Sequence, residues 1–347
     1  MTVPTQADEP RSLPYRAPLP RALLVYGARK SGTTLVQSML DGGASLPMVP
    51  GELKLKYIVK KRWIKSRSRT LAHWYAESGR SFFPVIPKPN GEEPARIAGL
   101  SREQVGQAID LEKYAEGLDA IARLGDPPLA EILREDARAF LGAMKADWRE
   151  ARFWGSKEVG GETAEILALF RECFPEGMLV LVLREPVFTV RSILMKRRRW
   201  GIRLGGIRSI MHEYGDAQRV INEGYREALG GNAVIVTYER LTADPEGESK
   251  LLCERLGIPF DEIFARPTTL GQEVVVHTSS RQTTEVFRQV PDWQEGLSRK
   301  QIFILSICRI FGPAAYRLRG KRMVSYQALT ELLDSQRPKG DQSSFRS

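Results

Sequence analysis

The sequence predicts an α/β fold in which a central parallel β-sheet is flanked by helices. Three short apolar runs carry this prediction, because each has the length and composition of a buried parallel strand and each leads into a helical pattern. The runs span residues 23–26, 178–183 and 233–237. The chain of 347 residues is long enough to form one large α/β domain or two smaller ones.

The first apolar run leads into a turn that is suited to an anion. Gly27 ends the run, Arg29 and Lys30 bring two positive charges, and residues 31–34 read Ser-Gly-Thr-Thr where helical spacing begins. A helix start offers free N–H groups and a positive dipole end to phosphate. A Walker A loop places its lysine directly after the last glycine, whereas Lys30 precedes the serine here. The pattern therefore favours a phosphate loop of another type over a plain polar turn.

The second apolar run ends in an arginine that is spaced for a phosphate. Arg184 follows the run, Pro186 suits the first turn of a helix, and Ser192 lies about two helical turns further on. A phosphate that lies along this helix can touch both Arg184 and Ser192. The sequence therefore contains two phosphate-type motifs, each of which closes a buried strand.

The rest of the chain follows the same α/β pattern around a helical insertion. Amphipathic spacing predicts helices over 111–122, 129–148, 163–170, 211–229 and 302–311, and Pro245 opens another that reaches Leu256. We expect one domain over 21–335, with a helical cap inserted at 53–150. We expect a mobile N-terminal arm over 1–20 and a disordered tail over 336–347.

Composition limits the partners and the compartment. The net charge of +10 suits an anionic ligand or acceptor, although it also fits nonspecific nucleic-acid binding. Three separated cysteines argue against a disulfide framework and a zinc site, and favour a reducing, cytoplasmic location. No run reaches the ~20 apolar residues of a membrane helix, so we expect no membrane partner. Oligomeric state cannot be read from the sequence.

Two basic stretches leave their role open. Residues 53–70 hold eight lysines and arginines and no acid, with Trp63 inside the stretch and Trp74 just after it. Residues 196–199 are four cations in a row before Trp200. Each stretch fits an acceptor surface, a nucleic-acid patch or an ordinary solvated helix face.

At these motifs the chain resembles the sulfotransferases that use 3′-phosphoadenosine 5′-phosphosulfate (PAPS). Residues 30–34, KSGTT, match the 5′-phosphosulfate loop of the family, and residues 184–192 match its R-x-P-x-x-x-x-x-S site for the 3′-phosphate. Glu185 and Phe188 stand where Asn and Asp are commoner. Residues 238–260 are similar to a later YExL…DP…LGxxF pattern. The resemblance covers roughly 22–319 and is absent over the cap.

The resemblance implies a P-loop-NTPase-like sheet and in-line transfer of a sulfuryl group from PAPS to an acceptor hydroxyl or amine, without a metal. It implies nucleotide binding by Arg29, Lys30, Ser31, Gly32, Thr33, Thr34, Arg184, Ser192, Tyr238, Ser279, Ser280 and Arg281. In that pattern Lys30 stabilises the leaving phosphate, Tyr238 lies near the adenine, and 3′-phosphoadenosine 5′-phosphate (PAP) is the product. The acceptor is a small molecule, a carbohydrate or a peptide, and nucleic acid is not favoured.

Two further catalytic roles follow from the same resemblance. In the family pattern a strand ends in a lysine that faces the sulfuryl group. Lys157 occupies the matching place, although Glu158-Val159 stands where Thr/Asp-Pro is usual. Glu52 matches the general base of the branch that includes bacterial, carbohydrate and protein-tyrosine enzymes, and His73 is the second candidate for the base. An ATP-dependent kinase or NTPase and a noncatalytic RNA- or polyanion-binding protein remain alternatives. A kinase would need a magnesium site, for which these motifs offer no GK[ST] sequence.

Overall fold

The computed structural model describes residues 18–65, 70–80, 100–202, 206–231, 233–274, 276–277, 282–283, 292–318 and 323–335. The expected arm at 1–20 lies outside these residues except for 18–20, and the expected tail at 336–347 lies wholly outside them. Both therefore stay predictions. Among the described residues, no helix is both long and apolar enough to cross a bilayer.

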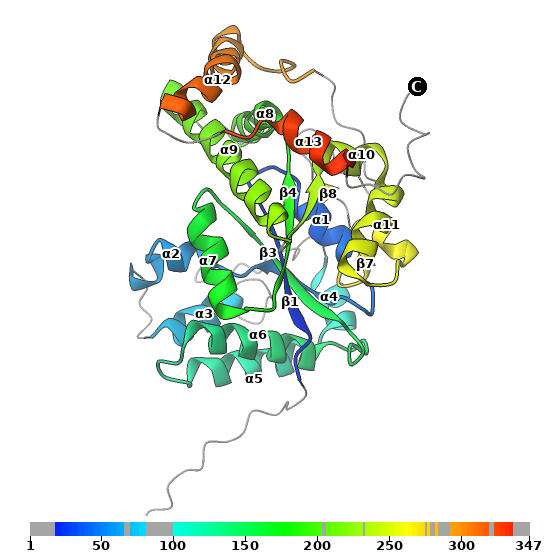
Figure 1. Cartoon of the computed structure of the whole chain (residues 1–347). Helices are drawn as coiled ribbons and strands as arrows, with labels where there is room; N and C mark the ends of the chain where they lie inside the picture. Colours follow the sequence, from blue (N-terminus) through cyan, green and yellow to red (C-terminus); the bar gives the residue numbers. More distant parts are fainter. Residues whose placement is uncertain are drawn as a thin grey trace, which may run out of the picture.

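A five-stranded parallel sheet forms the centre of the molecule (Figure 1). Its strands are β1 Arg21–Gly27, β2 Met48–Glu52, β3 Phe153–Val159, β4 Met178–Leu183 and β5 Ala233–Thr237. Their order across the sheet is β2-β3-β1-β4-β5, so β1 is central and the chain moves to opposite sides of it. In open parallel α/β sheets, ligands bind outside the carboxyl ends of the strands where the order reverses.

Helices cover both faces of the sheet. They are α1 Thr33–Leu40, α2 Leu55–Val59, α3 Leu71–Arg80, α4 Arg102–Ala108, α5 Leu111–Ala122, α6 Leu129–Ala143, α7 Thr163–Cys173, α8 Pro186–Arg199, α9 Ile207–Leu229, α10 Tyr238–Ala243, α11 Pro245–Leu256, α12 Arg299–Leu318 and α13 Tyr326–Ser335. Short 3₁₀ turns lie at Arg62–Lys65 and Glu262–Ala265. Two-residue strands pair as β6 Thr268–Thr269 with β7 Gln272–Glu273, and as β8 Val276–His277 with β9 Gln282–Thr283.

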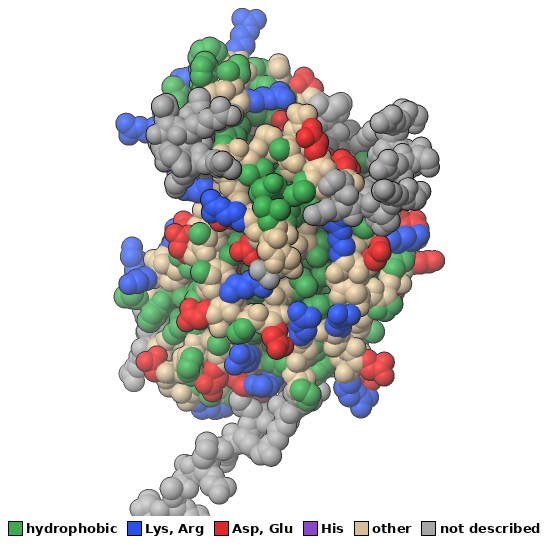
Figure 2. Space-filling model, viewed as in Figure 1, with side chains coloured by type: hydrophobic (Ala, Val, Ile, Leu, Met, Phe, Trp, Pro, Cys, Tyr) green, Lys and Arg blue, Asp and Glu red, His purple; other side chains and the backbone are tan. Residues whose placement is uncertain are grey.

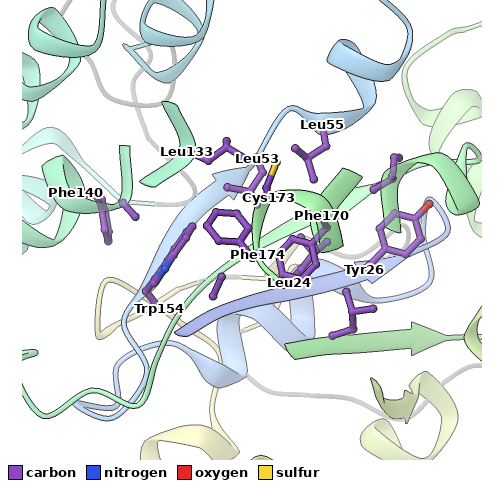
Figure 3. Packing of buried hydrophobic residues seen from close by; sticks show 14 of the residues in the cluster. Leu24, Tyr26, Leu53, Leu55, Leu133, Phe140, Trp154, Phe170, Cys173 and Phe174 are labelled. Carbon is purple, nitrogen blue, oxygen red and sulfur yellow. The ribbon is translucent and has the colours of Figure 1, made fainter. Parts of the chain in front are cut away.

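The alternation of side chains along β1 builds a core on each face. Leu24 and Tyr26 point into the larger core, where they meet apolar residues of α7, α9 and the helices between β2 and β3. Leu23 and Val25 point into the other, against α1 and α11. Figure 3 shows the larger core, in which the rings of Trp154 and Phe174 pack edge to face with centroids 5.6 Å apart. Both faces are buried, which explains the continuous apolar run.

The described residues between β2 and β3 form helices that pack on the larger core. Inside this region a buried carboxylate, Asp136 of α6, accepts hydrogen bonds from Tyr75 of α3 and Tyr114 of α5 at 3.1 and 2.9 Å. The pKa of Asp136 is raised to about 6, because burial raises it by more than the two hydroxyl donors lower it. These bonds tie three helices together at one buried point.

The structure departs from the expected elements in four places. Residues 48–52 form an edge strand that the apolar runs of the sequence do not predict. Helix α6 ends at Ala143, and the predicted last residue of its stripe, Trp148, caps it by donating its indole N–H to the carbonyl of Leu141. Helices α7, α9 and α12 are longer than expected. Lys157 lies inside β3, which continues for two residues beyond it.

Candidate active site

The loop between β1 and α1 has a strained backbone that faces the carboxyl edge of the sheet. Lys30 is left-handed with φ of 67°, and Gly32 has φ of 107°. A Cβ on Gly32 would stand 2.4 Å from the Tyr238 ring, so only glycine fits there. Gly32 is also the N-cap of α1 and gives it no side-chain hydrogen bond. The first N–H groups of the helix are thus left for an anion.

Lys30 lies in a cluster of positive charge. The pKa of Lys30 is lowered to about 8, first by burial and then, in this order, by the nearby cations Lys196, Arg184 and Lys157. Lys196 comes from α8, Arg184 directly follows β4, and Lys157 lies in β3. Such a cluster of positive charges, with no anion bound, attracts a ligand that carries several negative charges. The hydroxyl of Ser31 is buried in the same loop without a hydrogen-bond partner among the described residues.

The second phosphate motif lies beside the first. Arg184 follows β4 and donates hydrogen bonds from Nη1 to the carbonyl of Lys30 at 3.1 Å and to Ser192 Oγ at 3.0 Å. Its guanidinium also stacks over the ring of Tyr238, with 4.2 Å to the centroid. Tyr238 begins α10 directly after β5 and packs against Gly32. Residues of β1, β4 and β5 therefore meet at one edge, because the parallel register brings their ends level.

Lys157 and Glu52 extend this edge on the other side of β1. Lys157 donates to Thr34 Oγ1 at 2.6 Å, which joins β3 to the first turn of α1. Glu52 of β2 lies opposite Lys157 of β3 in the register of the two strands. Burial lowers the pKa of Lys157, and the carboxylate of Glu52 partly opposes this shift. The two residues assigned to catalysis besides Lys30 are thus neighbours.

Glu52 is held in place by Lys56, which the sequence shows only as one of the eight cations of residues 53–70. Lys56 Nζ donates to Glu52 Oε2 and lies 3.5 Å from Glu158 Oε1. Glu158 is fully buried, its Oε2 has no hydrogen-bond partner among the described residues, and burial raises its pKa to about 7. The spacing of Glu52 and Lys56, four residues apart, was the available signal for this pair.

A small cavity lies behind Glu52, between β2 and the helices packed on it. Its lining includes Glu52, Lys54, Tyr75, Asp136 and Ser156. The hydroxyl of Ser156 in β3 donates a hydrogen bond to the carbonyl of Gly51 at 3.2 Å, which holds the end of β2 against β3. The cavity has polar groups on its walls next to the candidate base.

Other predicted site residues lie apart from this cluster or outside the description. Arg29 pairs with Glu213 of α9 at 3.2 Å, so its side chain reaches toward that helix. His73 is half-exposed on α3 and pairs with Glu77 at 3.3 Å. Thr33 is buried at the start of α1. Ser279, Ser280 and Arg281 lie outside the described residues. Within the described part of the chain, no group of three or more His, Cys, Asp or Glu side chains is arranged to hold a metal ion.

Comparison with known proteins adds a family to this geometry. A family model described as "Sulfotransferase family" matches residues 22–262. A protein-tyrosine sulfotransferase of Drosophila melanogaster is 21% identical over 262 residues, which cover 74% of this chain and 41% of that protein. Protein-tyrosine sulfotransferase A of Caenorhabditis elegans is 24% identical over 130 residues, covering 37% and 34%. The chain thus spans less than half the length of both relatives.

Solved structures with a similar course of the chain include two bacterial proteins. One is the sulfotransferase domain from the Synechococcus PCC 7002 olefin synthase, at 17% identity and a TM-score of 0.47, covering 86% of this chain and 98% of that one. The other is a sulfotransferase from Alicyclobacillus acidocaldarius, at 16% identity and 0.43, covering 88% and 98%. The match of the family model covers well over half of the chain, from the start of β1 to beyond α11. This protein belongs to the sulfotransferase family.

Proposed function

We propose that this protein transfers a sulfuryl group from PAPS to an acceptor hydroxyl or amine. The observation that carries the proposal is Lys30, which is half-buried among Lys196, Arg184 and Lys157 at the start of a helix whose first N–H groups have no side-chain cap. This unbalanced positive cluster fits the 5′-phosphosulfate of PAPS. Arg184 and Ser192, which already contact each other, fit the 3′-phosphate.

The residues of the site have separate tasks in this reaction. When bound, PAPS supplies the sulfuryl group that the acceptor takes by in-line displacement. Lys30 and the N–H groups of α1 stabilise the negative charge that grows on the departing phosphate oxygen. This interaction lowers the free energy of the transition state more than that of the ground state. Lys157, held by Thr34, neutralises charge on the sulfuryl oxygens.

Glu52 is the proposed general base. Its Oε2 is held by Lys56, and its position beside Lys157 brings it to the sulfuryl side of the loop. Orientation by Lys56 leaves Oε1 to accept the proton of the acceptor hydroxyl. His73 is less suited, because its ring pairs with Glu77 on the same helix and is half-exposed.

The acceptor class is the least constrained part of the proposal. Two relatives are protein-tyrosine sulfotransferases, which supports a tyrosine-containing peptide as the first acceptor to test. Small phenols and carbohydrates belong in the same panel. Sulfur-35-labelled PAPS with each acceptor, followed by separation of labelled product, identifies the class.

Nucleotide titration tests the proposal before any acceptor is known. We expect PAP, without magnesium, to bind more tightly than AMP, which lacks the 3′-phosphate, and more tightly than ATP with magnesium. Isothermal titration calorimetry measures all three. A preference for ATP with magnesium would overturn sulfuryl transfer in favour of a kinase-like activity.

A further inference from the structure

The exposed apolar side chains of the described residues are concentrated on one part of the molecule. Of the ten exposed large hydrophobic residues in the described part of the chain, eight lie in the segments 200–202, 207–211 and 303–311. They are Trp200, Ile202, Ile207, Met211, Phe303, Ile307, Ile310 and Phe311. Large contiguous apolar patches are rare on the surface of soluble proteins, and those that occur mark interaction sites.

Helix α12 contributes the largest share because it is apolar on two sides. Its inner side, with Ile304, Leu305 and Cys308, packs into a core shared with α8 and α9. Its outer side shows Phe303, Ile310 and Phe311 at 66%, 67% and 60% exposure. A helix that only covered the core would carry polar residues on that outer side.

These segments form one surface. Ile210 and Tyr214 of α9 share a core with Ile304 and Cys308 of α12, so the neighbouring Ile207 and Met211 border the same helix pair. At the other end, Arg198 of α8 donates to the carbonyl of Gly296, just before α12 begins. Figure 2 shows hydrophobic and basic side chains together at the top of the view, where Figure 1 places α12.

The segments that form this surface are strongly basic, and Arg198, Arg199, Arg208, Arg299 and Lys300 are exposed on it. Residues 196–212 and 298–318 contain ten lysines and arginines and no aspartate or glutamate, so they carry +10, which equals the net charge of all 347 residues. The remainder of the chain is balanced. Apolar aromatic and aliphatic side chains set among Lys and Arg are the composition of elements that lie in the headgroup region of an anionic bilayer.

The lack of a membrane-spanning run led us to expect no membrane partner, but a peripheral contact needs no such run. We propose that residues 196–202, 206–212 and 299–312 form a docking surface for an anionic lipid bilayer, into which Phe303, Ile310, Phe311 and Trp200 insert. Charge complementarity selects this occupant. A two-fold contact with a second copy would bring two strongly basic surfaces together, and a nucleic-acid backbone offers nothing to bury three large side chains of one helix face. Lys196 belongs both to this surface and to the cluster around Lys30, so the docked face borders the anion loop.

Flotation of the full chain with lipid vesicles tests this surface. We expect binding to vesicles of phosphatidylcholine mixed with phosphatidylserine, and binding at least about tenfold weaker to phosphatidylcholine alone. The triple variant F303S/I310S/F311S should lose at least about tenfold in affinity for the mixed vesicles. The double variant R208E/K300E should bind more weakly, and raised salt should weaken the wild type.

A matched control separates insertion from simple loss of surface hydrophobicity. I64S/L229S removes two equally exposed side chains, at 61% and 60% exposure, outside the surface, and should bind vesicles as the wild type does. Retained PAP affinity and an unchanged melting temperature show that the triple variant is folded. Three outcomes would overturn the proposal: no binding to mixed vesicles at low salt, equal binding by the triple variant, or wild-type self-association that the triple variant abolishes.

Discussion

The side chain of Arg184 donates a hydrogen bond to the backbone carbonyl of Lys30 at 3.1 Å, across a separation of 154 residues. This bond joins the two phosphate motifs before any ligand binds. Because Arg184 also holds Ser192 and stacks on Tyr238, the shape of the anion loop depends on the second motif. A substitution in one motif should therefore alter the conformation of the other.

The protonation of Lys30 makes nucleotide affinity depend on pH. Its pKa is lowered to about 8 in the free protein, chiefly by burial, and a bound anion favours the charged form and raises that pKa again. PAP affinity should therefore fall as pH rises through about 8. Calorimetry in buffers of different ionisation heat should detect proton uptake there. Lys30→Arg stays charged and should lose this pH dependence, while equal dependence in both proteins would contradict the assignment.

Replacing Glu52 should separate binding from turnover. Glu52→Gln keeps the shape of the side chain and removes the base, so kcat should fall by about a hundredfold or more while PAP affinity stays within about twofold. His73→Ala is the matched control and should retain wild-type kcat. Turnover assays with labelled PAPS decide between them, and the opposite pattern would assign the base to His73.

Arg184 and Ser192 should set the preference for a 3′-phosphate. Arg184→Ala should weaken PAP binding by about ten- to a hundredfold, as expected for hydrogen bonds to a charged group, and AMP binding much less. Ser192→Ala should show a smaller effect in the same direction. If both variants keep the wild-type ratio of PAP to AMP affinity, the 3′-phosphate binds elsewhere.

Gly32→Ala should disable the loop. The residue has φ of 107°, and its Cβ would meet the Tyr238 ring at 2.4 Å, so the loop or the ring must move. We expect PAP binding to fall by at least about tenfold. Gly215→Ala is the control, because a Cβ at Gly215 in α9 meets nothing within 4 Å, and this variant should bind normally. Calorimetry and thermal unfolding report both properties.

Glu158 should contribute a pH-dependent part of the stability. Its pKa is raised from about 4.5 to about 7 in the folded state, so the native protein holds this proton more tightly than the unfolded chain. This stabilisation is present below about pH 4.5 and is lost as pH rises through about 7. Glu158→Gln should therefore gain melting temperature relative to wild type between about pH 5 and about pH 8. The exposed Glu165→Gln should not, and a parallel shift in both variants would contradict the argument.

The parts of the fold that the sequence predicts are those with strong local patterns. β1, β4 and β5 are continuous apolar runs, and both phosphate motifs follow directly from their ends, so Lys30 and Arg184 could be paired before the structure was known. Residues 48–52 could not be recognised as a strand, because an edge strand tolerates proline and glycine that a central strand excludes.

The missing parts of the site depend on contacts that no local pattern records. Lys56 reaches both Glu52 and Glu158, and the second of these contacts crosses from α2 to β3. Lys196 acts on Lys30 only because α8 returns along the edge of the sheet. The stacking of Arg184 on Tyr238 likewise joins the ends of two neighbouring strands. Long-range packing decides such pairs.

The left-handed backbone at Lys30 lowers the stability of the folded protein. An L-residue in that conformation costs roughly 1–2 kcal/mol, and glycine would adopt it without that cost. Lys30→Gly should therefore give a protein that melts at a higher temperature and no longer holds its nucleotide. Lysine at this position therefore costs the fold stability that glycine would not, and the nucleotide binding proposed for Lys30 accounts for that cost.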